Sequence, residues 1–138
     1  MPKITYNRGT DLPIIDATVL YWPLHGVPHP SGTVPQMAVR ALIDTGASHV
    51  VVKPHIVTAL GLPYACDVDN TVVGGTVHKV PAYAGEVIMG TPALGCAVPD
   101  MLMLSQSLGA EYDIIIGWGA LSRCDWTFDR SGTFTQSW

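Results

Sequence analysis

The sequence has 138 residues, of which 48% are hydrophobic and 13% are charged. This length predicts a single domain, residues 1–138, with room for a modest core but not for two lobes. The net charge of −4 excludes a basic footprint for nucleic acid, and the sequence has no run of 18 apolar residues that would span a membrane. A charged share well below the usual value of about 25% indicates that a partner covers some apolar surface.

The three cysteines, Cys66, Cys96 and Cys124, are an odd number with wide spacing. They fit neither a disulfide framework nor a zinc site. The first residues lack the long apolar centre of a signal peptide. We therefore expect a reducing, cytoplasmic setting.

The first third of the chain is predicted to form strands. Residues 4–6, 14–21 and 37–43 are the candidates, and the second is rich in β-branched side chains. Residues 22–35 carry four prolines and two glycines, which predicts an exposed loop. His25 and His29 are four residues apart in this loop, but the prolines exclude a helix and no third ligand is nearby. We therefore expect no metal site there.

The chain is organised around residues 41–48. An apolar run ends at Ile43, so Asp44 is predicted at the exit of a buried strand. Thr45 offers a hydroxyl, and Gly46 is expected to adopt backbone angles closed to other residues, so that water or substrate can approach the acid. Ala47 completes the run that begins at Asp44. The sequence Asp-Thr-Gly also occurs as an ordinary turn after a strand, which is the alternative interpretation.

A hydrolase triad built on Asp44 and His49 is a weaker interpretation. The sequence lacks the Gly-x-Ser-x-Gly nucleophile elbow. In an extended segment, five residues would also separate the two side chains by more than about ten ångströms. We therefore interpret His49 as structural.

The middle of the chain contains a predicted hairpin. Residues 50–52 form a strand, and residues 54–60, followed by Gly61, form a short helix. Two β-branched runs then flank Gly74 and Gly75, which predicts a tight turn with positive φ. Strands continue over residues 77–80 and 83–89. The hairpin could close over a cleft as a lid, and an ordinary surface hairpin is the alternative.

The last third begins with a short predicted strand at residues 95–98 and an apolar segment, 101–108, of undecided type. Three isoleucines ending at Gly117 predict a buried strand that stops sharply. A helical turn at residues 120–123 and a closing pair of strands, 125–128 and 132–136, follow.

These features in this order resemble the retropepsins, the single-lobed aspartic proteases of retroviruses and their cellular and bacterial relatives. Asp44-Thr45-Gly46-Ala47 matches their catalytic motif, Val73-Gly74-Gly75-Thr76-Val77 their flap, and Ile115-Ile116-Gly117 the strand beside the catalytic loop. Residues 2–5 resemble the N-terminal interface strand, and Arg8 falls where retroviral members carry an arginine. The resemblance implies an all-β, single-lobed acid-protease barrel with one short helix and a flap hairpin, assembled as a homodimer.

Two positions depart from the retroviral pattern. Retroviral members usually carry Asp where Ser48 stands and Arg where Trp118 stands. Loss of both members removes an ion-pair network without leaving either charge unpaired. Ser48 resembles the cellular and bacterial branches.

The resemblance implies an aspartic endopeptidase. Peptide hydrolysis by this route needs an ionised and a protonated carboxyl group, and this chain has one Asp-Thr-Gly run. Two copies would each contribute Asp44, and Thr45 would form a cross-subunit hydrogen bond. An extended peptide would lie between this floor and the flap residues Val73, Gly74, Gly75 and Thr76, with apolar side-chain pockets. No metal or organic cofactor is needed.

The termini are the expected seam of this homodimer. Residues 4–6 and 132–136 would interleave with a second copy into one sheet, as in the family, with Cys124 nearby. Trp126, Phe128 and Phe134 would supply apolar area there. Two alternatives stay open: a catalytically silent retropepsin-like domain for dimerisation or peptide binding, and a small β-barrel binding module in which Asp44 caps a turn.

Overall fold

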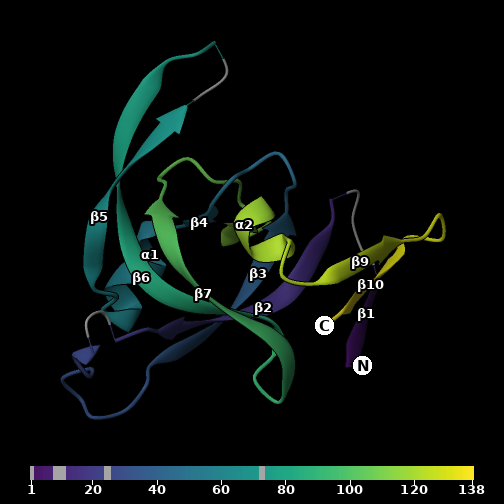
Figure 1. Ribbon diagram of the computed structural model, residues 1–138, viewed down its shortest axis with the longest axis horizontal. Coiled ribbons are helices and arrows are strands. Elements are labelled where there is room, and N and C mark those ends of the chain that lie inside the picture. Colours follow the sequence, from purple (N-terminus) through teal and green to yellow (C-terminus); the bar gives the residue numbers. More distant parts are fainter. Residues whose placement is uncertain (1, 8–11, 24–25, 72–73) are drawn as a thin grey trace.

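The fold is described by a computed structural model over residues 2–7, 12–23, 26–71 and 74–138. The prediction of an all-β fold with little helix is confirmed (Figure 1). The elements are β1 Lys3–Asn7, β2 Ile14–Tyr21, β3 Gln36–Ile43, β4 Val50–Val52, α1 Pro54–Leu60, β5 Tyr64–Thr71, β6 Val77–Thr91, β7 Leu94–Leu104, β8 Ile114–Ile116, α2 Trp118–Leu121, β9 Asp125–Phe128 and β10 Thr133–Ser137. None of the described helices is long and apolar enough to cross a membrane.

A closed barrel forms the body of the molecule. The larger sheet has the strand order β2-β3-β8-β4-β7-β6-β5, and an additional pairing of β2 with β6 closes six of its strands into the barrel. β5 stays outside this closure, at the edge of the sheet, and among the described strands it pairs with β6 alone. The two strands extend away from the barrel as a long arm, drawn in teal in Figure 1.

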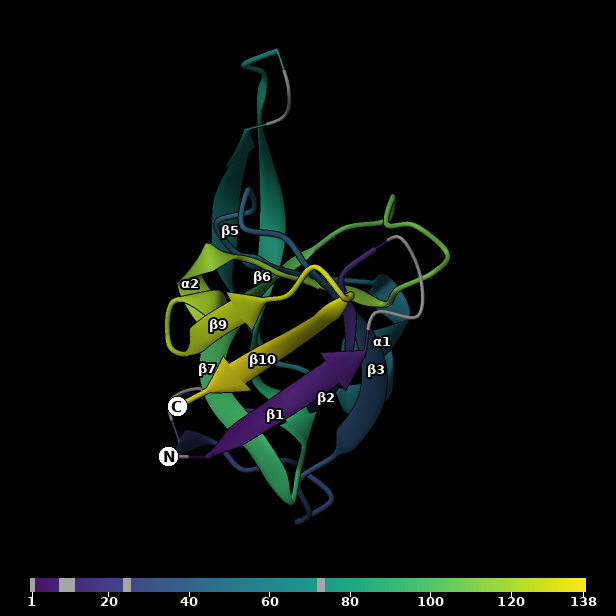
Figure 2. The ribbon, with the colours of Figure 1, turned by 90° about the vertical axis from the view of Figure 1, so that its right-hand side faces the viewer.

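A smaller sheet brings the two ends of the chain together. Its order is β1-β10-β9, so β10 lies between two strands of its own chain (Figure 2). Gln136 of β10 is fully buried: its amide nitrogen donates to Cys124 Sγ at 3.2 Å, and its oxygen accepts from the Tyr6 hydroxyl at 3.0 Å. Burial also raises the pKa of Tyr6 well above its ordinary value. The small sheet therefore contains a satisfied polar contact at its centre.

The barrel interior is filled by β-branched and other aliphatic side chains. They come from alternate positions of the strands, because successive side chains of a strand point to opposite faces of the sheet. Its largest fully buried members include Ile15, Val19, Val50, Val52, Val87, Met89, Leu102, Ile114 and Ile116. Helix α1 closes one end with Ile56, Val57 and Leu60 inward. Pro54 stands in its first turn, and Gly61 ends it with φ of 60°.

Most predicted elements are confirmed, and the bounds of β2, β4 and α1 match. The undecided segment 101–108 is strand only as far as Leu104, because β7 pairs along β6 up to that region. The predicted break at Pro81 is wrong, since β6 runs through it. Pairing of β6 with β7 begins at Ala82, so Pro81 has only β5 beside it and its missing N–H is tolerated. The predicted helical turn begins at Trp118 rather than at residue 120.

The terminal strands pair with one another within one chain, with Ile4 opposite Gln136 and Phe134 opposite Phe128. The sheet shared with a second copy stays a prediction. Phe134 is buried within its own chain. Arg8, His25 and Val73 lie outside the described residues.

Candidate active site

Asp44 lies at the exit of β3, as predicted. β3 pairs in parallel with β8, which places Ile43 beside Ile116. The Asp44 N–H donates to the Ile116 carbonyl at 3.1 Å, so the start of the loop is fixed to the strand that ends at Gly117. The Asp44 side chain is half-buried at the edge of the apolar interior.

The loop after Asp44 is closed by local hydrogen bonds. The Gly46 N–H donates to Asp44 Oδ1 at 2.9 Å, and the Ala47 N–H donates to the Asp44 carbonyl at 3.2 Å. The expectation of special backbone angles at Gly46 is wrong, because it is not among the glycines with positive φ. Its role is spatial: a Cβ there would lie 3.2 Å from Asp44 Oδ1. Thr45 is exposed.

The far side of the loop is tied to the start of α2. The Trp118 N–H donates to the Ala47 carbonyl at 2.7 Å, and the Gly119 N–H donates to the Ser48 carbonyl at 3.2 Å. Gly117 makes this approach possible, because a Cβ on it would lie 2.4 Å from the His49 carbonyl oxygen. The late Ile-Ile-Gly segment therefore packs beside the candidate catalytic loop, as the sequence predicts.

A cavity of about 350 Å³ lies on one side of the loop. The loop and residues 69–71 of the arm both contribute to its wall. Its described lining residues are Gly46, Ala47, Ser48, His49, Val51, Asp69, Asn70, Thr71, Met103, Ser105, Leu108 and Ile115. The expectation of apolar pockets is only partly met, since about half of these side chains carry polar groups. We refer to this cavity as the groove.

The arm borders the groove through residues 69–71 of β5 and not through the glycines of its turn. Gly74 and Gly75 have φ of 102° and 83°, as the predicted turn requires, and both are exposed together with Thr76. None of these three is among the described residues that line the groove. The arm contributes residues 69–71 instead, which the sequence analysis missed. Pairing outward from Gly74 and Gly75 would have found them, because β5 and β6 pair as the two arms of this hairpin, with Thr71 opposite Val77 and Asp69 opposite Lys79.

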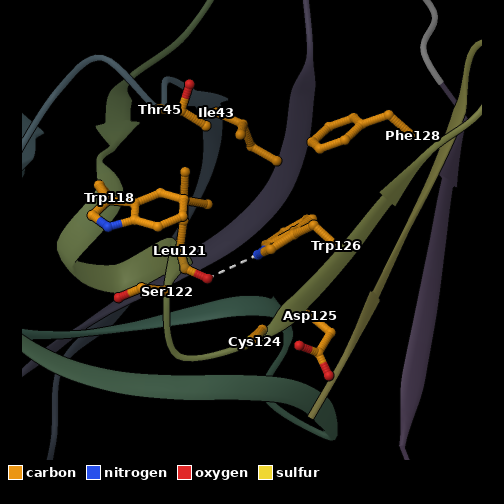
Figure 3. Close-up of a pocket in the computed structure, with 9 residues that line it drawn as sticks. All are labelled: Ile43, Thr45, Trp118, Leu121, Ser122, Cys124, Asp125, Trp126 and Phe128. Carbon is orange, nitrogen blue, oxygen red and sulfur yellow. Dashed lines mark hydrogen bonds between the residues drawn. The ribbon is translucent and has the colours of Figure 1, made fainter.

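A second cavity, of about 390 Å³, also borders the loop (Figure 3). It extends from Ile43 and Thr45 past Trp118 to Phe128 on β9. Trp126 stands at its wall and donates its indole N–H to the Leu121 carbonyl at 3.0 Å. The sequence analysis noted Trp118 only as a departure from the retroviral pattern. The structure makes it one wall of this cavity.

Two residues that the sequence analysis considered as metal ligands and set aside make other contacts. His29 contacts the edge of the Tyr21 ring, with centroids 4.9 Å apart, and its Nδ1 lies 2.6 Å from the Ser31 hydroxyl. Cys96 hydrogen-bonds Cys124 despite their separation in sequence, and burial together with this bond raises the pKa of the Cys96 thiol to about 12. A thiol with so high a pKa is a poor nucleophile.

Comparison with known proteins agrees with this geometry. The chain resembles a solved retropepsin-like aspartic protease from Rickettsia conorii, with a TM-score of 0.61 and 15% identity over 99% of this chain and 90% of that one. The retroviral protease-like domain of Ddi1 from Leishmania major has 15% identity and a TM-score of 0.49, over 88% of this chain and 83% of that one. The EIAV protease in complex with an inhibitor has 18% identity and a TM-score of 0.47, over 87% and 93%.

The fold is therefore retropepsin-like, as predicted. A search among curated proteins finds no match. The sequence matches the profile of the Aspartyl protease family over residues 31–119, which is more than half of its length and includes Asp44 and Gly117. This chain belongs to the aspartyl protease family.

Proposed function

We propose that this chain is an aspartic endopeptidase whose catalytic pair consists of Asp44 from each of two copies. The observation that carries the proposal is the position of Asp44. Its backbone is fixed to β8, its carboxylate is oriented by the Gly46 N–H, and its loop borders the groove. A carboxyl group held in this way beside a groove is suited to acid–base chemistry.

One carboxyl group is not sufficient for the reaction. An ionised carboxylate takes a proton from the attacking water, while a protonated carboxyl group polarises the scissile carbonyl. Two such groups a few ångströms apart cannot both ionise, so they share one proton. The sequence has a single Asp-Thr-Gly run, and a two-fold symmetric pair of copies supplies the second group.

The groove is suited to an extended peptide. Its walls come from the loop that carries Asp44 and from residues 69–71 of an edge strand. A peptide in the extended conformation can satisfy its main-chain groups along such an edge and place alternate side chains in the groove. The polar groups of Ser48, His49 and Asp69 favour substrates with at least one polar side chain near the cleaved bond.

Cleavage of a mixed peptide library by wild-type protein and by Asp44→Asn tests this function. We expect cleavage by the wild type to be best at mildly acidic pH, because the pair must be singly protonated, and to be inhibited by a peptide mimic with a central hydroxyl. Asp44→Asn should lower kcat by about a thousandfold. Asp16→Asn, at an exposed position on β2, is the matched control and should cleave normally.

A rate that kept rising well above neutral pH would argue against a shared proton. Peptide binding without cleavage by the wild type would instead support a silent peptide-binding domain. Cleavage that survived Asp44→Asn would contradict the assignment of the acid.

A further inference from the structure

Asp113 lies directly before β8 and forms hydrogen bonds on both sides of it. In the larger sheet, β8 stands between β3 and β4. On the β3 side, the Arg40 N–H donates to Asp113 Oδ2 at 2.9 Å, and the Asp113 N–H donates to the Arg40 carbonyl at 2.8 Å. On the β4 side, the N–H of Lys53, the residue after that strand, donates to the Asp113 carbonyl at 3.3 Å. One residue therefore joins three strands.

The Asp113 carboxylate takes the place of a main-chain acceptor. In a regular parallel pair, Arg40 would accept from the Asp113 N–H and donate to the carbonyl two residues earlier, that of Glu111. Glu111 lies in a turn, and β8 begins only at Ile114. The Arg40 N–H binds the Asp113 side chain instead. The carboxylate therefore continues the pairing with β3 beyond the point where the backbone of the preceding segment can do so.

β8 in turn determines where Asp44 lies. The loop of residues 44–49 connects β3 to β4, and β8 pairs with both of these strands. The pairings are short, with three positions shared with β3 and two with β4. A slip of one residue between β3 and β8 would displace Asp44 by about 3.3 Å, the rise of one residue along a strand. The Ile116 carbonyl holds the near end of β8 through the Asp44 N–H, and Asp113 holds the far end.

We propose that Asp113 is a positioning residue for the catalytic carboxyl group, because it fixes β3 and β4 to the far end of β8 and thereby fixes the place of Asp44. This inference rests on the proposed function, in which the rate depends on that place. A hydrogen bond from a backbone N–H to an ionised carboxylate is stronger than one between neutral groups. Arg40 is exposed, so solvent reduces the contribution of this bond to unfolding, and Asp113 affects the register more than the stability.

Amide hydrogen exchange tests the placement without any need for activity, in the Asp44→Asn background so that self-cleavage cannot interfere. Asp113→Ala should speed exchange about tenfold at the Arg40 amide and also at the amide of residue 44, which Asp113 does not touch. Asp113→Asn keeps a side-chain acceptor and should restore most of the protection. Asp129→Ala is the matched control, because Asp129 Oδ1 accepts the Ser131 N–H at 2.7 Å in the turn after β9. It should leave both amides unchanged.

Turnover of one peptide, measured on folded protein at equal fractions of dimer, gives the second readout. Asp113→Ala should lower kcat about tenfold or more and leave KM nearly unchanged, and Asp113→Asn should restore most of the rate. Two carboxyl groups that lie further apart share a proton less tightly, so their two apparent pKa values approach each other and the pH profile of kcat narrows. A loss of folded protein would lower the rate at every pH without changing that width.

The outcomes separate this proposal from the proposed function. Unchanged exchange at residue 44 in folded Asp113→Ala would overturn the positioning role, and so would an unchanged kcat with an unchanged pH profile. Equal losses in Asp113→Asn and Asp113→Ala would overturn the role of the side-chain acceptor. If the wild type cleaves no peptide, the peptidase is refuted, while faster exchange at residue 44 still supports the placement by Asp113. Asp113→Leu, which is similar in shape and has no acceptor, gives the same test if Asp113→Ala does not fold.

Discussion

The loop after β3 and the outer half of the β5–β6 arm are built from opposite kinds of contact. The loop is held from three directions, by Ile116 before it, by Trp118 and Gly119 after it, and by its own hydrogen bond to Asp44. The arm projects beyond the barrel (Figure 2), and its described side chains from Gly74 to Lys79 are all exposed. The ion pair from Lys79 to Asp69 in the arm spans 3.1 Å between side chains that are mostly exposed.

The difference separates two requirements of the proposed chemistry. An acid that must meet its copy within a few ångströms needs a rigid support, since a displacement of about 1 Å can cost about a hundredfold in rate. A lid that admits a peptide must open at little free-energy cost, and regions with few buried contacts do so. Substitutions in the loop should therefore affect both stability and activity, and those in the arm mainly activity.

The largest effect is expected from Gly117→Ala. The new Cβ would lie 2.4 Å from the His49 carbonyl oxygen and 2.6 Å from that of Ala47, and backbone atoms cannot swing aside. We expect a loss of about 1–3 kcal/mol of unfolding free energy and a fall in kcat of about a hundredfold. Thermal denaturation and peptide cleavage measure the two effects. Gly119→Ala, whose Cβ would lie 3.1 Å from the Ser48 carbonyl oxygen, should be milder, and equal effects would refute the close-approach argument.

Gly75→Val should have a large effect on turnover only. Its φ of 83° is unfavourable for a β-branched residue, so the turn should distort and kcat/KM should fall about tenfold, with the melting temperature nearly unchanged. Gly32→Val places the same strain, at φ of 74°, in a loop away from the arm and should cleave normally. Normal cleavage by Gly75→Val would show that the arm is not a functional lid.

The ion pair of the arm should contribute little to stability. Removing it by Lys79→Ala or Asp69→Asn should change the unfolding free energy by less than about 1 kcal/mol, since both side chains are exposed. Asp69 also lines the groove, so Asp69→Asn should change KM for peptides more than Lys79→Ala does. Equal KM values for the two variants would remove Asp69 from the substrate site.

The smallest effect is expected at the base of the arm. The Tyr64 hydroxyl donates to Asp67 Oδ1 at 2.9 Å, which raises the pKa of Tyr64 above its ordinary value of 10.0. A raised pKa means that the contribution is fully present below pH 10.0 and is lost as the pH rises through the folded value. The melting temperatures of wild type and Tyr64→Phe should therefore differ slightly near pH 8 and converge at alkaline pH. A difference that grew with pH would contradict this sign.

The sequence predicted the loop well because its information is local. An apolar run that stops at Asp44, and three isoleucines that stop at Gly117, each mark a strand end without reference to the rest of the chain. The spacing of the two motifs then matched a known family. The role of Gly46 was not predictable in the same way, because it depends on the distance to the Asp44 carboxylate rather than on backbone angles.

Features that depend on which segments of the chain lie side by side were not predictable from the sequence. No local sequence pattern indicates that β1 pairs with β10 of its own chain, or that residues 69–71 of the arm reach the groove. The exposure of Trp118 is likewise set by how α2 sits against the loop. Such pairings are decided by the whole chain, so the sequence supplied the strands but not their neighbours.

The central claim, that two copies share one catalytic pair, is tested most directly by the specific activity of the wild-type protein over a dilution series. Sedimentation at the same concentrations gives the fraction of dimer. Our account predicts that activity per chain falls in proportion to that fraction and approaches zero for the monomer. A specific activity that stayed constant while the protein dissociated to monomers would contradict it.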